Sequence, residues 1–208
     1  NQLQAWTSGQ RLLPSSTGPD LTFQLPVEYT WATDASIDDL NQDGSPDLLV
    51  TEGYDINGSN LTQPAQVVFS LGKSDQSMVE LPTLPGGWTK IAPAWQTGGP
   101  PSLVTSGNNG ETRVSQFSQQ REWSEVTNYT GGGHLAELDG VSPPERVYLA
   151  STATYPPEPP TVRVERYDGN HWQPTHTFPL DSEELSTWNH TFCAVDFEGD
   201  GRQELVIT

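Results

Sequence analysis

The sequence of 208 residues predicts an all-β fold built from repeated sheets, and three observations lead to that prediction. Helical periodicity is nearly absent, because only Asp181–Trp188 has the pattern of a short helix and glycine or proline interrupts almost every other stretch. Short runs rich in β-branched and aromatic residues recur between turn residues, as in sandwiches, barrels and propellers. A loop motif also returns about every 52 residues, which is the length of a propeller blade.

The clearest predicted strands are short apolar runs that carry valine, isoleucine, tyrosine or phenylalanine. They are Asp47–Thr51, Gln66–Phe69, Arg146–Ala150 and Thr161–Glu165. Clusters of glycine, serine and aspartate such as Leu71–Asp75 and Tyr167–Asn170 bound these runs and predict tight turns between antiparallel neighbours.

The repeated loop occurs twice in full. Asp39–Asp47 has acidic or amide residues at loop positions 1, 3, 5 and 9 and glycine at position 6, and Asp196–Glu204 repeats this arrangement. Two degenerate copies lie between them: Ala94–Ser102 keeps the glycine, and Glu137–Glu145 has about two extra residues. Position 9 then falls at residues separated by 55, 43 and 59 positions, namely Asp47, Ser102, Glu145 and Glu204.

A second hairpin lies between successive loops. One of its strands ends with an apolar residue that is followed three positions later by an aromatic residue. We name the strands around each acidic loop A and B, and those of the second hairpin C and D. The chain then reads C-D, three times A-B-C-D, and A-B.

We therefore predict a β-propeller of four blades with four strands each, in which the N-terminal C-D strands close on the C-terminal A-B strands. Closure would bury two open sheet edges, and residues 1–208 would form a single domain. The alternative is a part of a larger propeller, completed by more chain or by another copy.

The two full loops resemble the calcium loops of FG-GAP/VCBS repeats, which occur in integrin α-subunit propellers, propeller lectins and many secreted bacterial proteins. The resemblance covers most of the chain by its period, and two of the four loops carry it strongly. Propellers of that family usually have about seven blades, so four blades are a departure from the family pattern.

Alternating oxygen ligands in a tight loop suit Ca²⁺, which takes six to eight hard oxygens. We predict two calcium sites with a structural role. The first uses the side chains of Asp39, Asn41, Asp43 and Asp47 with the carbonyl of Ser45, and the second uses Asp196, Glu198, Asp200 and Glu204 with the carbonyl of Arg202. The Glu137–Glu145 loop is a weaker candidate, and Ala94–Ser102 has no carboxylate. The alternative is that these loops are metal-free Asx-type turns.

The charge excludes several partners. With 27 acidic and 9 basic residues the formal net charge is −18, which disfavours nucleic acid and anionic membrane surfaces. No apolar run approaches the roughly 18 residues of a membrane span, so no membrane insertion is expected. Cys193 is the only cysteine, so no intrachain disulfide forms. No signal peptide is visible, and we expect a mature secreted, cell-surface or periplasmic protein from which any targeting signal has been removed.

The ligand is harder to predict. Trp172, Tyr54 and Tyr155 are candidates for exposed contacts with a ligand, whereas Trp31, Trp88 and Trp188 recur before the loops and favour packing between blades. We predict a non-catalytic recognition module for glycan or protein. The alternative is a structural subunit in a homo- or hetero-oligomer. A polysaccharide lyase-type enzyme is less favoured, because no convergent acid/base set appears.

Overall fold

The computed structural model describes residues 2–5, 21–24, 33–52, 64–71, 73–82, 84, 88–107, 109–150, 161–180 and 192–207. Within these ranges the protein is all-β: every regular element is a strand and every ladder is antiparallel. No helix long and apolar enough to cross a membrane occurs in the described part of the chain. The predicted short helix at 181–188 lies outside the described residues.

The strands form three four-stranded sheets flanked by two two-stranded ones. The short sheets are β1 (Gln2–Ala5) with β2 (Leu21–Gln24) and β15 (Phe192–Val195) with β16 (Glu204–Ile207). The first four-stranded sheet contains β3 (Thr33–Asp38), β4 (Asp47–Glu52), β5 (Gln66–Phe69) and β6 (Ser77–Glu80). The second contains β7 (Trp88–Ala92), β8 (Ser102–Ser106), β9 (Glu111–Phe117) and β10 (Trp123–Thr130). The third contains β11 (His134–Ala136), β12 (Glu145–Ala150), β13 (Thr161–Tyr167) and β14 (Trp172–Pro179).

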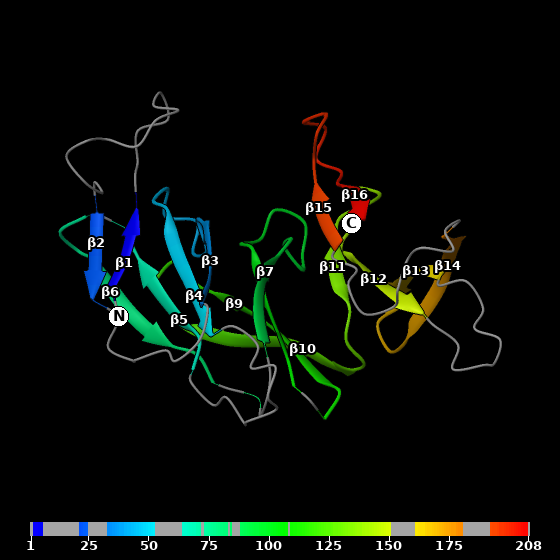
Figure 1. Cartoon of the computed structure of the whole chain (residues 1–208), viewed down its shortest axis with the longest axis horizontal. Helices are drawn as coiled ribbons and strands as arrows, with labels where there is room; N and C mark the ends of the chain where they lie inside the picture. The colour runs from blue at the N-terminus through cyan, green and yellow to red at the C-terminus, as the bar shows by residue number, and fades with distance from the viewer. Residues whose placement is uncertain are drawn as a thin grey trace.

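This succession of a pair, three meanders and a pair is the order that the repeat predicts. Each four-stranded sheet pairs its strands in chain order, so strands A, B, C and D lie side by side. Figure 1 places β1 and β2 at one end of the long axis and β13 and β14 at the other. Among the described residues no ladder joins β1 to β16, so the predicted closure of the two terminal pairs is not observed.

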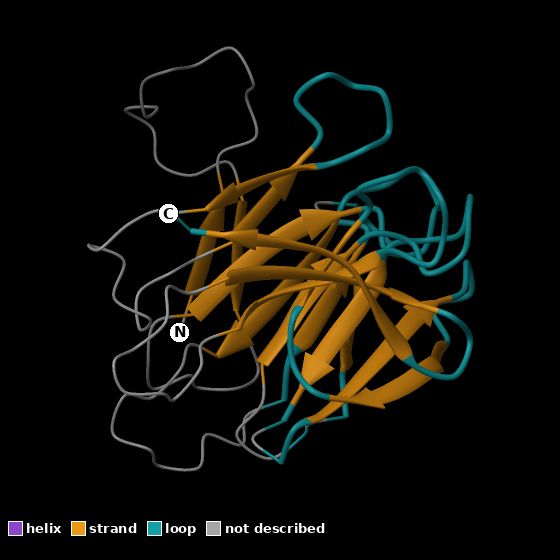
Figure 2. Ribbon diagram, turned by 90° about the vertical axis from the view of Figure 1, so that its right-hand side faces the viewer, coloured by secondary structure: helices purple, strands orange, loops and turns teal. Residues whose placement is uncertain are grey.

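The first strand of the second sheet contacts both of its neighbours, because β7 contacts β3 and β4 of the first sheet and β11 of the third. In the perpendicular view most strands are inclined along a similar axis with their arrows pointing both ways, and most of the described loops lie toward one side (Figure 2). The A strands therefore lie toward the middle of the assembly, and strands B, C and D extend away from it.

The interface between the first and second sheets is apolar. Phe69 and Phe117 meet edge to face, with ring centroids 4.8 Å apart and planes at 87°. The buried residues Leu40, Leu49, Val67 and Leu103 complete the cluster. Aromatic pairs in this geometry add about 0.5–1.5 kcal/mol beyond the apolar area that they bury.

An arginine organises the interface between the second and third sheets. The Arg146 guanidinium lies 4.8 Å from the ring centroid of Trp172 and 5.6 Å from that of Tyr129. Its Nε donates to Glu165 at 3.0 Å, and the Tyr148 hydroxyl donates to the same carboxylate at 2.7 Å. The charge is therefore paired with a carboxylate and covered by aromatic rings, as burial of an arginine requires.

Each sheet turns one face to the sheet before it and the other to the sheet after it. The residue at loop position 10, the first after position 9, packs on the preceding sheet: Leu103 joins the cluster with the first sheet, and Leu205 packs on the third. The residue at loop position 2 packs on the following sheet, as Leu40, Trp95 and Leu138 show. The direction of packing is thus the same at all three interfaces.

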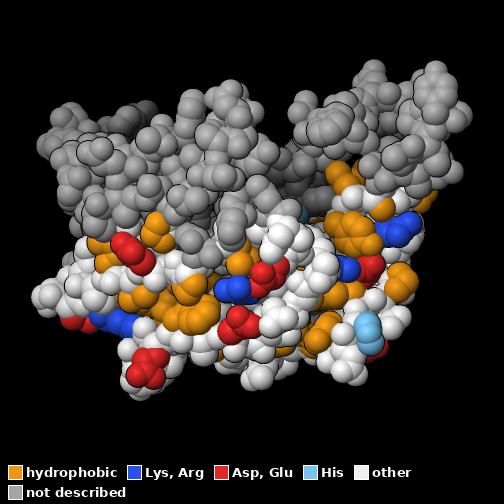
Figure 3. Space-filling view, turned by 90° about the horizontal axis from the view of Figure 1, so that it is seen from below, with side chains coloured by type: hydrophobic (Ala, Val, Ile, Leu, Met, Phe, Trp, Pro, Cys, Tyr) orange, Lys and Arg blue, Asp and Glu red, His pale blue; other side chains and the backbone are white. Residues whose placement is uncertain are grey.

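Each end of this series has an exposed large hydrophobic side chain. At position 2 of the last loop, Phe197 is 68% exposed. On the first sheet, the row that contains position 10 pairs Ile37, Leu48, Val68 and Met78 across four strands. Its central residues Leu48 and Val68 are buried, whereas Ile37 at its edge is 59% exposed. Hydrophobic side chains also reach the surface among charged groups in the view from below (Figure 3).

Candidate functional site

The four A–B loops, residues 39–47, 94–102, 137–145 and 196–204, lie next to one another in chain order. Hydrogen bonds between their side chains and backbones connect each loop to the next. Gln42 Nε2 donates to the Gly99 carbonyl at 2.9 Å, Thr97 Oγ1 donates to Ser142 Oγ at 3.1 Å, and the Glu137 N–H donates to Gln203 Oε1 at 3.0 Å. The loops therefore form one continuous end of the molecule.

One hydrogen bond recurs in all four loops. The side chain at position 9 accepts the backbone N–H of position 2, seven residues earlier. The distances are 2.9 Å for Asp47 from Leu40, 3.0 Å for Ser102 from Trp95, 3.0 Å for Glu145 from Leu138 and 2.9 Å for Glu204 from Phe197. The equal separation shows that all four loops have the same length. The expectation of about two extra residues in the Glu137–Glu145 loop was wrong. This loop has nine residues like the other three, but its glycine lies before position 6.

The first and fourth loops also share their internal hydrogen bonds. The position 1 carboxylate accepts the N–H groups of positions 5 and 6, and the position 5 carboxylate accepts the N–H of position 7. In the first loop Asp39 accepts Asp43 at 3.0 Å and Gly44 at 2.9 Å, and Asp43 accepts Ser45 at 2.8 Å. In the fourth loop Asp196 accepts Asp200 at 3.2 Å and Gly201 at 2.8 Å, and Asp200 accepts Arg202 at 2.9 Å. Gly44 and Gly201 have φ of +80° and +87°, a region that glycine enters without strain.

These hydrogen bonds shift the acidity of the loop carboxyls. The hydrogen bond with Ser45 holds the pKa of Asp43 below its usual value, and the Gly201 N–H does the same for the pKa of Asp196. Burial raises the pKa of Asp47, and the N–H groups of Ser70 and Leu40 oppose that shift. The exposed carboxylates are therefore favoured in their charged form, as a cation site needs.

The chemistry of the predicted ligands fits a hard cation, but their spacing does not form a coordination sphere. Calcium–oxygen distances of 2.3–2.6 Å bring ligand oxygens within about 5 Å of one another. Among the described residues, one group of three acids reaches 4.8 Å or less, and it is Glu137, Asp139 and Glu145 in the third loop. The carboxylates of Asp39, Asp43 and Asp47 do not form such a group, nor do those of the fourth loop, including Glu198. Calcium in these two loops stays a prediction.

Basic side chains approach the acidic loops. The Lys73 ammonium contacts Ser45 Oγ, and Arg121 Nη2 lies 3.7 Å from Asp43 Oδ2. In the third loop Arg166 contacts the carboxylates of Asp139 and Glu145. Single-sequence reasoning missed these contacts, because the basic partners lie more than 20 residues away, in the β5–β6 turn, in the β9–β10 turn and on β13.

A cavity of about 650 Å³ lies among the A strands and the A–B loops. Its lining includes Asp38 of β3, Lys90 of β7, His134 of β11 and Ala194 of β15, with Glu137 and Asp196 at the loop end. His134 stacks on Trp88 with centroids 6.2 Å apart, and burial lowers the pKa of His134. The three four-stranded sheets and the β15–β16 pair thus border the same cavity.

The structure describes two of the predicted aromatic residues, Trp172 and Trp88, and both pack between sheets. Trp172 is half-buried between the second and third sheets, with its ring centroid 5.0 Å from Tyr129 and 6.3 Å from Trp95. Trp88 packs against the same cluster, which agrees with a packing role. Tyr54, Tyr155, Trp31 and Trp188 lie outside the described residues.

No protein-family model, curated protein or solved structure matches this chain. The likeness to FG-GAP/VCBS repeats therefore rests on the loop residues and their period.

The position 9 hydrogen bond predicts a graded loss of stability. Asp47 is fully buried and accepts the N–H groups of Leu40 and Ser70, both at 2.9 Å. Asp47→Ala should lower the free energy of unfolding by about 2–4 kcal/mol, because two buried donors lose their acceptor. Ser102→Ala removes the acceptor of one backbone N–H, from Trp95, and should cost about 1 kcal/mol, because Gln116 Nε2, which also donates to Ser102, keeps the Pro100 carbonyl as its acceptor. Urea unfolding of both variants tests this order, and equal losses would contradict it.

Proposed function

We propose that this chain is a non-catalytic, calcium-binding recognition module of the FG-GAP/VCBS propeller type, which presents its A–B loops to a glycan or a protein. The observation that carries the proposal is the series of four equivalently hydrogen-bonded loops on one end of the sheets. Two of these loops have the full acidic pattern. The fold alone does not define the ligand, so the loop end is argued from its own groups below.

The proposed architecture is a ring of four blades around the cavity. A cavity bordered by the four A strands β3, β7, β11 and β15 is what a small propeller has at its centre. The exposed hydrophobic side chains of the two ends would meet in a ring, because Phe197 of the fourth loop is 68% exposed and Ile37 at the edge of the first sheet is 59% exposed. Contact between them would repeat the packing seen at the other three interfaces.

The terminal strand pairs complete this ring. An apolar groove of about 610 Å³ lies on the third sheet beside β16, lined by Val162, Val164, Phe178 and Leu205 among others. On β1 and β2, Leu3 is opposite Phe23 and Ala5 is opposite Leu21, while the alternate positions are polar. Eight residues connect β2 to β3, a length between the three and twelve residues that connect the other D strands to their next A strand. We propose that the pair β1–β2 docks beside β16 and covers this groove.

Hydrogen exchange on the full chain tests the closure. If β1 pairs with β16, the outward amides of β16 should exchange at least tenfold more slowly than those of a free edge. Phe197→Ser should reduce this protection, because it removes the apolar contact that the ring would bury, whereas Phe178→Ser tests the groove separately. Unprotected β16 amides in a monomer of 22.8 kDa would overturn the closure.

In each of the first and fourth loops, a bound calcium ion would link the carboxylates of that loop and oppose its opening. Chelation should therefore lower the melting temperature of the parent protein. Asp39→Asn and Asp196→Asn should each remove one calcium equivalent in titration calorimetry. Asp168→Asn is the matched control, since Asp168 also accepts two backbone N–H groups, from Asn170 and His171, but lies in the β13–β14 turn. A melting temperature that is unchanged by chelator would contradict calcium binding.

The proposed recognition surface is the loop end of the cavity. The acidic residues Asp38, Glu137 and Asp196 line this cavity together with Lys90, Thr97 and Ser142. Such a set offers both donors and acceptors to sugar hydroxyls or to polar side chains of a protein. A secreted, cell-surface or periplasmic location is part of the proposal.

A glycan array and a binding screen with the intact protein test this role. For the ligand found, Lys90→Met should weaken binding at least tenfold, while Arg163→Met, which changes an exposed arginine of β13 outside the cavity lining, should leave binding unchanged. Equal binding by the Lys90 variant would place the ligand elsewhere.

A structural role in an assembly is the second candidate, favoured by the exposure of Phe197 and Ile37 at opposite ends of the sheet series. A second copy that contacts both ends would form a head-to-tail oligomer. Native mass separates the two candidates, since a monomer of 22.8 kDa supports the closed module.

A further inference from the structure

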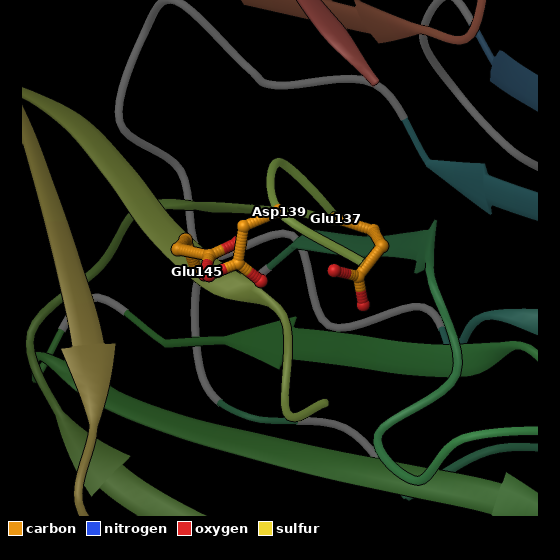
Figure 4. A group of neighbouring side chains, drawn as sticks. All are labelled: Glu137, Asp139 and Glu145. Carbon is orange, nitrogen blue, oxygen red and sulfur yellow. The ribbon is translucent and has the colours of Figure 1, made fainter. Parts of the chain in front are cut away.

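The third A–B loop concentrates negative charge. Glu137, Asp139 and Glu145 bring carboxylate oxygens within 4.8 Å of one another (Figure 4). The Glu145 side chain is 3% exposed, so water does not screen its charge. Carboxylates at this separation repel one another unless a cation lies among them.

A cation from the same sheet is already present. Arg166 of β13 donates from Nη2 to Glu145 Oε1 at 2.9 Å and also contacts Asp139 Oδ2. The second oxygen of Glu145 accepts the Leu138 N–H at 3.0 Å, which is the position 9 hydrogen bond of this loop. The guanidinium thus bridges loop positions 3 and 9, two of the positions that carry predicted ligands in the first and fourth loops.

The fit between the arginine and the three acids is incomplete. Arg166 Nε is buried without a hydrogen-bond partner, and so is Glu137 Oε1. Unpaired buried polar atoms are costly. The guanidinium contacts Asp139 and Glu145 through a single nitrogen, Nη2, and leaves Oε1 of Glu137 without a partner.

We infer that Arg166 acts as a built-in cation that occupies the metal position of the third loop. This inference rests on the calcium role proposed for the first and fourth loops, and it assigns the opposite behaviour to the third. The loop Glu137–Glu145 keeps its closed form in the presence of a chelator, because its positive charge is covalently part of β13.

Replacement of the arginine converts the loop into a metal site. In Arg166→Met, the methionine side chain replaces the apolar stem of the arginine and removes the guanidinium charge. In titration calorimetry with calcium alone, the variant should bind one equivalent more than the parent, and its lowered melting temperature should rise again with calcium. Asp139→Asn added to Arg166→Met should abolish the extra equivalent.

The controls separate this result from the calcium proposal for the other loops. Arg163→Met, on the same strand and exposed, should gain no site. The titration is repeated in the Asp39→Asn, Asp196→Asn background, where the gain should persist even if the parent binds no calcium. If Arg166→Met binds no more calcium than its parent and calcium does not restore its stability, the assignment of Arg166 is overturned.

Discussion

The hydrogen bond from position 2 to position 9 is the constraint on which the rest of the structure depends. It closes every A–B loop at the same length with an aspartate, a serine or a glutamate, so it needs an oxygen acceptor and not a particular side chain. Because it fixes the backbone at position 2, it also directs that side chain away from its own loop. Leu40, Trp95 and Leu138 then pack on the next sheet. The same hydrogen bond thus contributes both to loop closure and to sheet packing.

Regular packing direction explains why very different interfaces belong to one architecture. The first interface is apolar and centred on Phe69 and Phe117, whereas the second is built around the charge of Arg146. Both receive the position 2 residue from one side and strand residues from the other. Because the packing direction is the same at an apolar interface and at one built around an arginine, it comes from the backbone geometry of the antiparallel meander, which every sheet repeats.

The protein stabilises its excess of carboxylates in two ways. In the first and fourth loops, backbone N–H groups surround Asp39 and Asp196 and leave charged oxygens at the surface. In the third loop, Arg166 supplies the positive charge directly. A carboxylate held by N–H groups stays available to an external cation, whereas one held by a guanidinium is already neutralised.

The sequence alone determined the all-β class, the succession of strand pairs and the position 9 residues, because β-branched and aromatic runs, turn residues and a repeat near 52 residues are local signals. Strands such as Gln66–Phe69 were predicted at their observed bounds. Tertiary structure alone decided which carboxylates come together. Glu137, Asp139 and Glu145 converge although their loop looked degenerate, and Trp172 packs between sheets although its turn looked exposed. The physical reason is that ligand spacing and burial depend on neighbouring sheets, and on cations such as Arg166, that no local pattern records.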